Sequence, residues 1–289
     1  MRIVKVIGGL GNQMFQFALY KALQERFPEE HILLDLHCFN GYHKHHGFEI
    51  GRVFQAEYET ATLSDIAKLA YPYPNFLSWR IGSRILPIRK TMLKEKQNLS
   101  IEKQLFDKTK DTYYDGYWQH CYYFNDCKSL IQKTYSFPPF DNEKDRNIAK
   151  QSTNCESVAI HVRRGDYIKD KIFKNICTIE YYIAAIQEMY ARLSPDIFYI
   201  FSNDITWCRQ YLEQYIKNPI VYIDWHSETD SFRDMQLMSM CKHHIIANSS
   251  FSWWGAWLHE GNDHFVICPN KWTNLDNLCS PALESWIKI

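Results

Sequence analysis

The spacing of apolar residues along the chain predicts alternating strands and helices. Residues 2–7 form a short apolar run that indicates a strand, and apolar residues at helical spacing follow over 12–26. A second run at 32–36 completes a strand, helix, strand unit. The second half repeats the alternation, with strands predicted at 157–162, 197–201, 220–223, 245–247 and 264–268. This alternation calls for a parallel sheet covered by helices on both faces.

The segment 138–156 is the best candidate for a join between two lobes, because it begins with two prolines and is mostly polar. We therefore predict an α/β protein with lobes at 1–145 and 146–289. The segment 71–98 is the least regular, and basic and apolar residues are interleaved over 80–96. A helix docked on its own protein explains that mixture, and contact with an anionic membrane surface is the alternative.

Composition excludes several classes of protein. Lys plus Arg and Asp plus Glu both total 33, so the chain lacks the basic excess of a general nucleic-acid binder. The nine cysteines include no C-x-x-C pair, which favours a reduced protein over a disulfide scaffold or a zinc site. Neither a signal-peptide pattern nor a membrane-spanning apolar run is present, so we expect a cytoplasmic protein.

Polar clusters follow three of the strands predicted in the second half. They are Arg163-Arg164-Gly165-Asp166, Ser202-Asn203-Asp204 and Asn248-Ser249-Ser250. In a parallel sheet these strand ends share one edge, where ligands bind. Paired guanidinium groups and the start of a helix suit a diphosphate, and the Asn and Asp side chains suit ribose hydroxyls or a base edge. The predicted ligand is a nucleoside diphosphate.

The turn after the first strand allows a different interpretation. Gly9-x-Gly11 opens a helix as in a dinucleotide-binding fold, with Asp35 as the ribose acid, but Met14 occupies the third glycine position. An NAD(P)- or FAD-dependent oxidoreductase is therefore the alternative. No Asp-x-Asp occurs to hold a divalent ion, so we expect no metal and no cofactor, and arginines must offset the diphosphate charge.

Six motifs together resemble the bacterial α-1,2-fucosyltransferases, and the resemblance covers nearly the whole chain. The motifs are GGLGNQMFQF at 8–17, GYWQ at 116–119, HVRRGDY at 161–167, SFRDM at 231–235, NSSFSWWGAWL at 248–258 and PNKW at 269–272. The resemblance implies a GT-B-type glycosyltransferase with two Rossmann-like lobes and a cleft between them. It implies inverting transfer of L-fucose from GDP-β-L-fucose to the 2-hydroxyl of a galactoside, without a metal.

The resemblance also assigns roles. Arg163 contacts the leaving β-phosphate, and Arg164 supports the phosphates or the motif itself. His161, Asn203 and Asp204 match positions that contact the nucleoside. The remaining donor-side positions are Gly9, Asn12 and Gln13 toward the sugar, and Asn248, Ser249, Ser250 and Phe251 at the diphosphate. The carboxyl-terminal lobe would hold GDP-fucose.

The acceptor side and the base are less determined. Tyr117, Trp118 and Gln119 in the amino-terminal lobe are the expected acceptor contacts. Asp166 and Asp170 are alternative general bases, and proton loss to water or phosphate is a third route. A galactose-containing glycan of an O-antigen, a capsule or an oligosaccharide is the expected acceptor. A lipid-linked one would place residues 80–96 at the inner membrane face. A non-catalytic nucleotide-sugar-binding protein is a further alternative.

Overall fold

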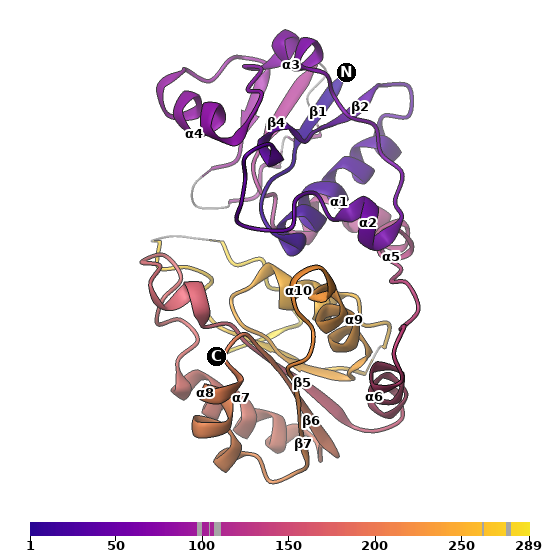
Figure 1. Cartoon of the computed structure of the whole chain (residues 1–289), viewed down its shortest axis with the longest axis vertical. Helices are drawn as coiled ribbons and strands as arrows, with labels where there is room; N and C mark the ends of the chain where they lie inside the picture. The colour runs from indigo at the N-terminus through magenta and orange to yellow at the C-terminus, as the bar shows by residue number, and fades with distance from the viewer. Residues whose placement is uncertain (97–99, 104, 107–110, 262, 276–278) are drawn as a thin grey trace. The chain divides into compact units, whose positions relative to one another are not determined.

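The computed structural model describes residues 1–96, 100–103, 105–106, 111–261, 263–275 and 279–289. It divides into two compact units, Met1–Pro138 (unit 1) and Pro139–Ile289 (unit 2). The division lies at the start of the segment predicted to join two lobes. Each unit is an α/β layer structure built on its own parallel sheet (Figure 1). The α/β class and the two Rossmann-like units expected of the GT-B type are therefore confirmed.

Unit 1 contains a four-stranded sheet in the order β2-β1-β4-β3. Its elements are β1 (Arg2–Lys5), α1 (Leu10–Arg26), β2 (Ile32–Asp35), α2 (Ile50–Phe54), α3 (Leu63–Leu69), α4 (Phe76–Ile85), β3 (Met92–Lys94), β4 (Thr112–Asp115) and α5 (Lys128–Thr134). Ile3 and Tyr113 pack with α3 on one face. Helix α1 lies on the other, beneath β1 and β2 (Figure 1).

Two strands of unit 1 were not predicted. β3 lies in the segment 71–98, which we expected to be the least regular, and β4 directly precedes the GYWQ motif at 116–119. Strand β4 has the sequence Thr-Tyr-Tyr-Asp and is buried at all four positions, including its polar ends. Asp115 is accommodated because it forms an ion pair with Lys5 on β1. A buried charge at a strand end looks like a turn residue until its partner is known.

Unit 2 contains a six-stranded sheet in the order β10-β9-β8-β5-β6-β7, with every pair parallel. Its elements are α6 (Glu143–Thr153), β5 (Ser157–Val162), α7 (Ile179–Arg192), β6 (Ile197–Ser202), α8 (Ile205–Tyr211), β7 (Ile220–Ile223), α9 (Phe232–Met240), β8 (His243–Ile245), α10 (Ser250–Trp257), β9 (Val266–Cys268) and β10 (Ile287–Lys288). The predicted alternation is confirmed, although β8 begins and ends two residues earlier than expected and β10 was missed.

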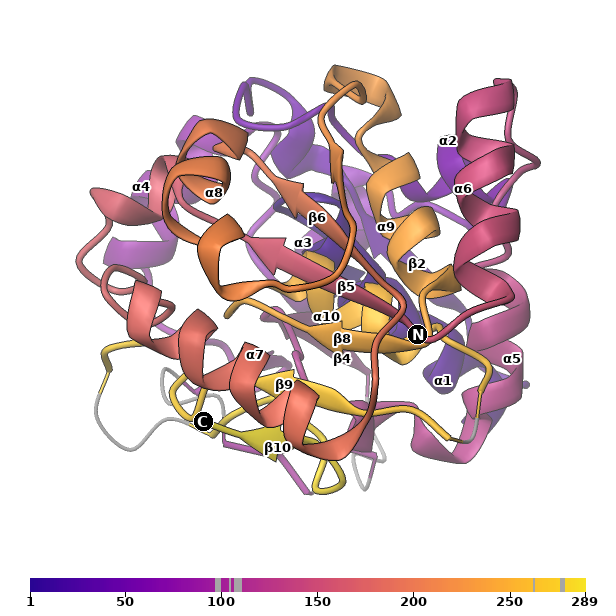
Figure 2. The ribbon, with the colours of Figure 1, turned by 90° about the horizontal axis from the view of Figure 1, so that it is seen from below.

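Helices cover both faces of the unit 2 sheet (Figure 2). Val158, Ile160 and Val162 of β5 pack with Tyr182 and Ile186 of α7 on one face. Because side chains alternate along a strand, Ala159 and His161 point to the other face, where α9 and α10 lie against each other. Strand β5 is thus buried on both faces, as its continuous apolar run predicts.

A buried histidine joins two helices of unit 2. His226 Nδ1 lies 2.7 Å from Asp234 Oδ1 on α9, and its Nε2 lies 2.9 Å from Asp145 Oδ2 on α6. Burial alone would lower the pKa of His226, but the hydrogen bonds with the two carboxylates outweigh it and the net shift is upward. The pKa of Asp145 is held below its usual value despite burial, because His226, Asn142 and Trp225 donate to it. Burial raises the pKa of Asp234.

This cluster predicts a pH dependence of stability. A folded-state pKa of His226 above its unfolded value of about 6.5 contributes stability that is complete below about pH 6.5 and is lost as the pH rises through the folded pKa. Between about pH 6 and about pH 8, the free energy of unfolding should therefore fall more in the wild type than in His226→Gln. Urea unfolding of both proteins at the two pH values measures these free energies. Equal falls in the two proteins would contradict this assignment.

Candidate active site

The three polar clusters of unit 2 follow adjacent strands. β5 lies between β8 and β6, and all three run in the same direction. Val162 at the end of β5 pairs with Ser202 at the end of β6. The prediction that the three strand ends share one edge of a parallel sheet is therefore confirmed.

This edge is also where the strand order reverses. The chain adds β6 and β7 on one side of β5 and then crosses to add β8, β9 and β10 on the other side. Connections that leave a sheet in opposite directions open a crevice at the carboxyl ends of the two strands, which is the usual ligand site of such folds. The rings of His161 on β5 and Phe251 on α10 lie at this point, with centroids 5.9 Å apart.

The two arginines differ in their contacts. Arg164 Nε donates to Asp204 Oδ2 over 3.2 Å, its backbone N donates to Asn203 Oδ1 over 3.0 Å, and its guanidinium lies 4.2 Å from the Trp207 ring. Arg164 thus fastens the end of β5 to the end of β6. Arg163 is half-buried, and its guanidinium carbon lies 5.5 Å from the centroid of the Tyr167 ring.

Gly165 is required by a close approach. A Cβ atom at this position would lie 2.3 Å from Nδ2 of Asn203, whose Oδ1 holds the backbone of Arg164. A larger residue would displace Asn203 and loosen the arginine loop.

His161 is a neutral imidazole in this site. Its side chain is only 6% exposed, and burial first, then the charge of Arg163, lowers its pKa to about 3. Tyr182 donates to its carbonyl oxygen over 3.1 Å and holds its backbone in place. Its Nδ1 atom is buried and has no hydrogen-bond partner among the described residues. His161 can therefore offer one hydrogen bond to a bound molecule without changing charge at neutral pH.

The third cluster shapes the start of α10. Asn248 donates from Nδ2 to the carbonyl oxygen of Trp272 over 3.0 Å and accepts from the Cys177 thiol, so its side chain is used internally. The Ser249 hydroxyl accepts from the backbone N–H of Phe251 over 3.3 Å and caps the helix. Ser250 is the first helical residue. The first N–H groups of a helix and its dipole favour an anion.

The two proposed bases, Asp166 and Asp170, both follow β5 in the chain. The side chain of Asp166 lies outside the described part of the chain. Asp170 is exposed, and its Oδ1 accepts from the backbone N–H of Ile172 over 2.8 Å.

In unit 1, the glycine-rich turn joins a second motif. Asn12 Oδ1 accepts from Gln119 Nε2 over 2.7 Å, so the turn after β1 and the loop after β4 are in contact. Gly8 has φ +99°, and a Cβ on Gly9 would lie 3.1 Å from the His45 ring. Gln13 is fully buried, and its side chain bonds to backbone groups, namely the carbonyls of Gly8 and Gly47 and the N–H of Glu49. The side-chain amide of Gln13 therefore holds the glycine-rich turn against the segment at 47–49.

The 116–119 loop exposes one aromatic ring and buries the next. Tyr117 is 40% exposed, whereas Trp118 is fully buried and packs edge-on against Tyr114 and Tyr123. Trp118 also has φ +55°, an uncommon value for a residue with a side chain. Of the two aromatic residues expected on the acceptor side, Tyr117 is the one whose ring can meet a ligand directly.

Glu95, which the sequence did not single out, holds this loop. Its carboxylate accepts from the backbone N–H groups of Tyr117 over 2.7 Å and of Trp118 over 2.8 Å. Burial raises the pKa of Glu95 to about 7, although these N–H groups act in the opposite direction. In the sequence it lies between Lys94 and Lys96, a pattern typical of a solvated surface, so nothing marked it.

A search of the described residues for three or more His, Cys, Asp or Glu side chains that could hold a metal ion finds none. Within the same residues, no helix is long and apolar enough to cross a membrane.

Comparison with known proteins gives consistent matches. The model of glycosyl transferase family 11 matches residues 90–289. An Escherichia coli α-1,2-colitosyltransferase is 32% identical and covers 99% of this chain and 98% of its own length. WbnK, an Escherichia coli O-antigen biosynthesis glycosyltransferase, is 30% identical over 98% of each chain.

More distant similarities are partial or weak. Galactoside α-(1,2)-fucosyltransferase 1 of Ateles belzebuth is 29% identical over 46% of this chain and 38% of its own. The crystal structure of POFUT1 in complex with GDP-fucose covers 92% of this chain and 97% of its own, with 15% identity and a TM-score of 0.46.

Proposed function

Because this chain belongs to glycosyl transferase family 11, we propose that it transfers L-fucose from GDP-β-L-fucose to the 2-hydroxyl of a galactoside, with inversion. The observation that carries the proposal is the position of Arg163 directly after β5, at the edge where the strand order reverses and where α10 follows the adjacent strand β8. Both features attract a diphosphate. Relatives named for colitose and fucose transfer support a deoxysugar donor.

The donor is assigned to unit 2. Arg163 contacts the β-phosphate, and the helix start at Ser249, Ser250 and Phe251 receives the diphosphate. His161, Asn203 and Asp204 face the nucleoside, while Arg164 and Asn248 keep these groups in place through the contacts described above. As the bond between fucose C1 and the β-phosphate oxygen breaks, its electron pair leaves with GDP. Fixed positive charge at that oxygen lowers the barrier.

The acceptor is assigned to unit 1. The exposed ring of Tyr117 contacts the acceptor, and Trp118 and Gln119 stabilise the loop that carries Tyr117. Gly9, Asn12 and Gln13 form the turn that faces the transferred sugar, with Gln13 acting through the backbone. The acceptor oxygen forms the new bond to C1 on the face opposite GDP and loses its proton to a carboxylate, for which Asp166 and Asp170 are the candidates. A pH–rate profile that loses its acidic limb in Asp166→Asn or Asp170→Asn identifies the base.

The reaction is proposed to need no metal, because arginine and a helix start supply the charge that a divalent ion would otherwise supply. GDP release at an unchanged rate in excess EDTA is the expected result.

A screen of GDP release tests the proposal. The protein is incubated with GDP-fucose and a panel of galactose-terminated glycans, and release is expected only when an accepted galactoside is present. Release with a colitose donor but not with fucose would change the donor and keep the reaction class. Binding of GDP-fucose without release for any acceptor would favour a non-catalytic binding protein, and turnover of NAD(P) would favour an oxidoreductase.

We further propose that α4 and the segment after it contact an anionic membrane surface, where a lipid-linked acceptor would be found. Residues 66–94 contain no Asp or Glu. They contain Lys68, Arg80, Arg84, Arg89, Lys90 and Lys94. Four apolar side chains of α4 and the segment after it are more than half exposed to solvent. Leu77 is 64% exposed, Ile81 52%, Ile85 73% and Ile88 59%. Exposed apolar residues beside a series of cations are typical of a helix that lies in a lipid interface.

Sedimentation with vesicles that contain anionic lipid measures this contact. The triple variant Arg80→Gln, Arg84→Gln, Lys90→Gln is expected to lose most of the binding, because each cation contributes about 1 kcal/mol near such a surface. Arg89 is left intact, since it donates to the carbonyls of Ala67 and Ala70. Neutralising three exposed lysines elsewhere, Lys128, Lys133 and Lys150, is the matched control. Equal binding of both triple variants would contradict a role for α4.

A further inference from the structure

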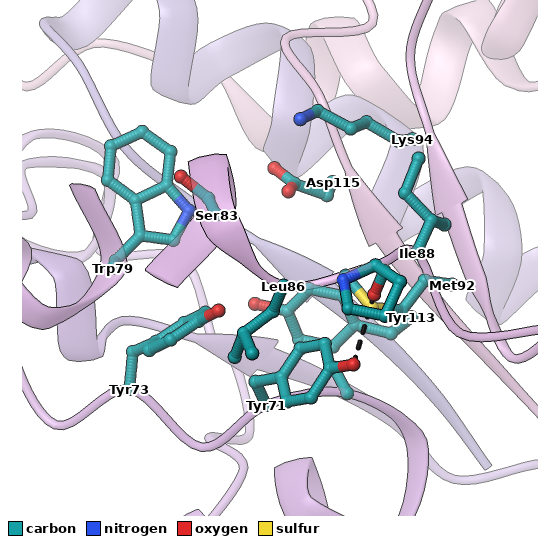
Figure 3. Close-up of a pocket in the computed structure, with 12 residues that line it drawn as sticks. Tyr71, Tyr73, Trp79, Ser83, Leu86, Ile88, Met92, Lys94, Tyr113 and Asp115 are labelled. Carbon is teal, nitrogen blue, oxygen red and sulfur yellow. Dashed lines mark hydrogen bonds between the residues drawn. The ribbon is translucent and has the colours of Figure 1, made fainter. Parts of the chain in front are cut away.

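A small pocket lies in unit 1 between α4 and the carboxyl-terminal ends of β3 and β4 (Figure 3). Its volume of about 20 Å³ holds one water-sized group. Trp79 and Ser83 of α4, and Leu86 directly after it, line one side, on the helix face opposite the exposed Leu77 and Ile85. The other lining residues that matter here are Tyr71, Tyr73, Lys94 and Asp115.

Two buried polar atoms in this pocket lack a hydrogen-bond partner in the described part of the chain. The hydroxyl of Tyr73 and Nε1 of Trp79 are buried and have no hydrogen-bond partner among the described residues. Both point into the pocket in Figure 3. Tyr71, on the same wall, is different, because its hydroxyl donates to the carbonyl oxygen of Pro87 over 3.0 Å. Buried polar groups in native proteins are almost always paired, so two orphans facing one cavity indicate a missing partner.

The position of Tyr73 is set by a glycine. A Cβ on Gly82 of α4 would lie 2.3 Å from Cε1 of the Tyr73 ring and 2.6 Å from its oxygen. The ring therefore rests directly on the helix backbone, which brings the hydroxyl into the pocket.

The polar groups also restrict what the partner is. Trp79 Nε1 can only donate, and the Asp115 carboxylate can only accept. Asp115 is bonded by Lys5, whose Nζ lies 4.1 Å from the centroid of the Trp79 ring, so carboxylate and indole are neighbours. An ammonium group cannot accept from the indole, and an anion cannot donate to the carboxylate. A neutral hydroxyl both accepts and donates, and it has the size of the cavity.

We propose that this pocket is a subsite for the acceptor glycan that receives one hydroxyl or hydroxymethyl group of the sugar. The proposal rests on the proposed function, which supplies a hydroxyl-rich ligand. It is favoured by the position of Lys94 and Asp115 at the ends of parallel strands, where such folds bind ligands. The rings of Tyr71, Tyr73 and Trp79 add the apolar surface that carbohydrate C–H groups need.

The test compares three conservative variants. Tyr73→Phe removes one orphan hydroxyl, Trp79→Phe removes the indole N–H, and Tyr71→Phe is the matched control, because its hydroxyl is already bonded to the carbonyl oxygen of Pro87. Each of the first two is expected to raise KM for the galactoside roughly three- to ten-fold, the loss of one neutral hydrogen bond, with KM for GDP-fucose unchanged. The control should retain the wild-type KM for the galactoside.

Deoxygalactosides and binding measurements complete the design. Removal of the hydroxyl that enters the pocket should weaken binding to the wild type, and the same removal should weaken binding less in Tyr73→Phe, which has already lost one of the two hydrogen bonds. Saturation-transfer NMR of the glycan measures binding without turnover, so a failure of transfer in the wild type leaves this test intact. The proposal is overturned if Tyr73→Phe behaves as Tyr71→Phe for every glycan, because the pocket then holds only water.

Discussion

Replacement of Arg163 by alanine is expected to lower kcat by about 10²- to 10³-fold, the usual loss when one fixed group that stabilises transition-state charge is removed. Arg163 directly follows β5 at the edge where the strand order reverses, and α10 follows the adjacent strand β8. Arg163 is half-buried, and its contact with the Tyr167 ring is not a buried core contact, so the melting temperature should stay within a few degrees of wild type. Steady-state kinetics with GDP-fucose and thermal unfolding measure the two effects.

Two further variants make this result specific. Arg163→Lys keeps the charge and loses the planar fork, so it should recover only part of the activity. Arg164→Ala removes the bonds that join the ends of β5 and β6, so it should lower the melting temperature and raise KM for GDP-fucose. Near-wild-type turnover of Arg163→Ala with an unchanged melting temperature would refute the role of Arg163.

Replacement of Lys5 by methionine is expected to destabilise unit 1 by about 3–5 kcal/mol, which is the usual result of breaking a buried ion pair. Lys5 on β1 and Asp115 on β4 are both buried and bond each other. Methionine fills a similar volume but leaves the carboxylate without its cation. Urea unfolding, with the free energy extrapolated to water, gives the magnitude.

The double variant Lys5→Met, Asp115→Leu separates charge from packing. Removal of both charges removes the unpaired buried group, so most of the lost stability should return. The prediction is contradicted if the free energy of unfolding of the single variant Lys5→Met lies within about 1 kcal/mol of the wild-type value. That result would show that water reaches Asp115 and that the ion pair is not buried.

The sheet of unit 2 could be predicted because its strands are buried on both faces and read as continuous apolar runs. The polar residues after β5, β6 and β8 were then predicted to share one edge of the sheet, and the parallel strand order confirms that they do. That prediction depended on the parallel direction of β5, β6 and β8 and not on any single residue.

The rest depended on contacts between residues distant in sequence. Glu95 looks like a surface residue, yet it holds the loop at 116–119. Gln16 of α1 is fully buried because Ile7 donates to its side chain and its amide donates to Gly116. The sequence alone does not show which groups a polar residue inside a helix will bond. The outward direction of Ile81 and Ile85 was equally hidden, since the sequence fits a docked helix as well as an exposed one.

The most direct measurement of the central claim is the NMR spectrum of the product formed from GDP-β-L-fucose and a β-galactoside. Inverting transfer should give GDP and a new α-fucosyl residue on O2 of galactose, formed by wild type and lost in Arg163→Ala. Free fucose alone, a β-linked product or a linkage to another oxygen would contradict it.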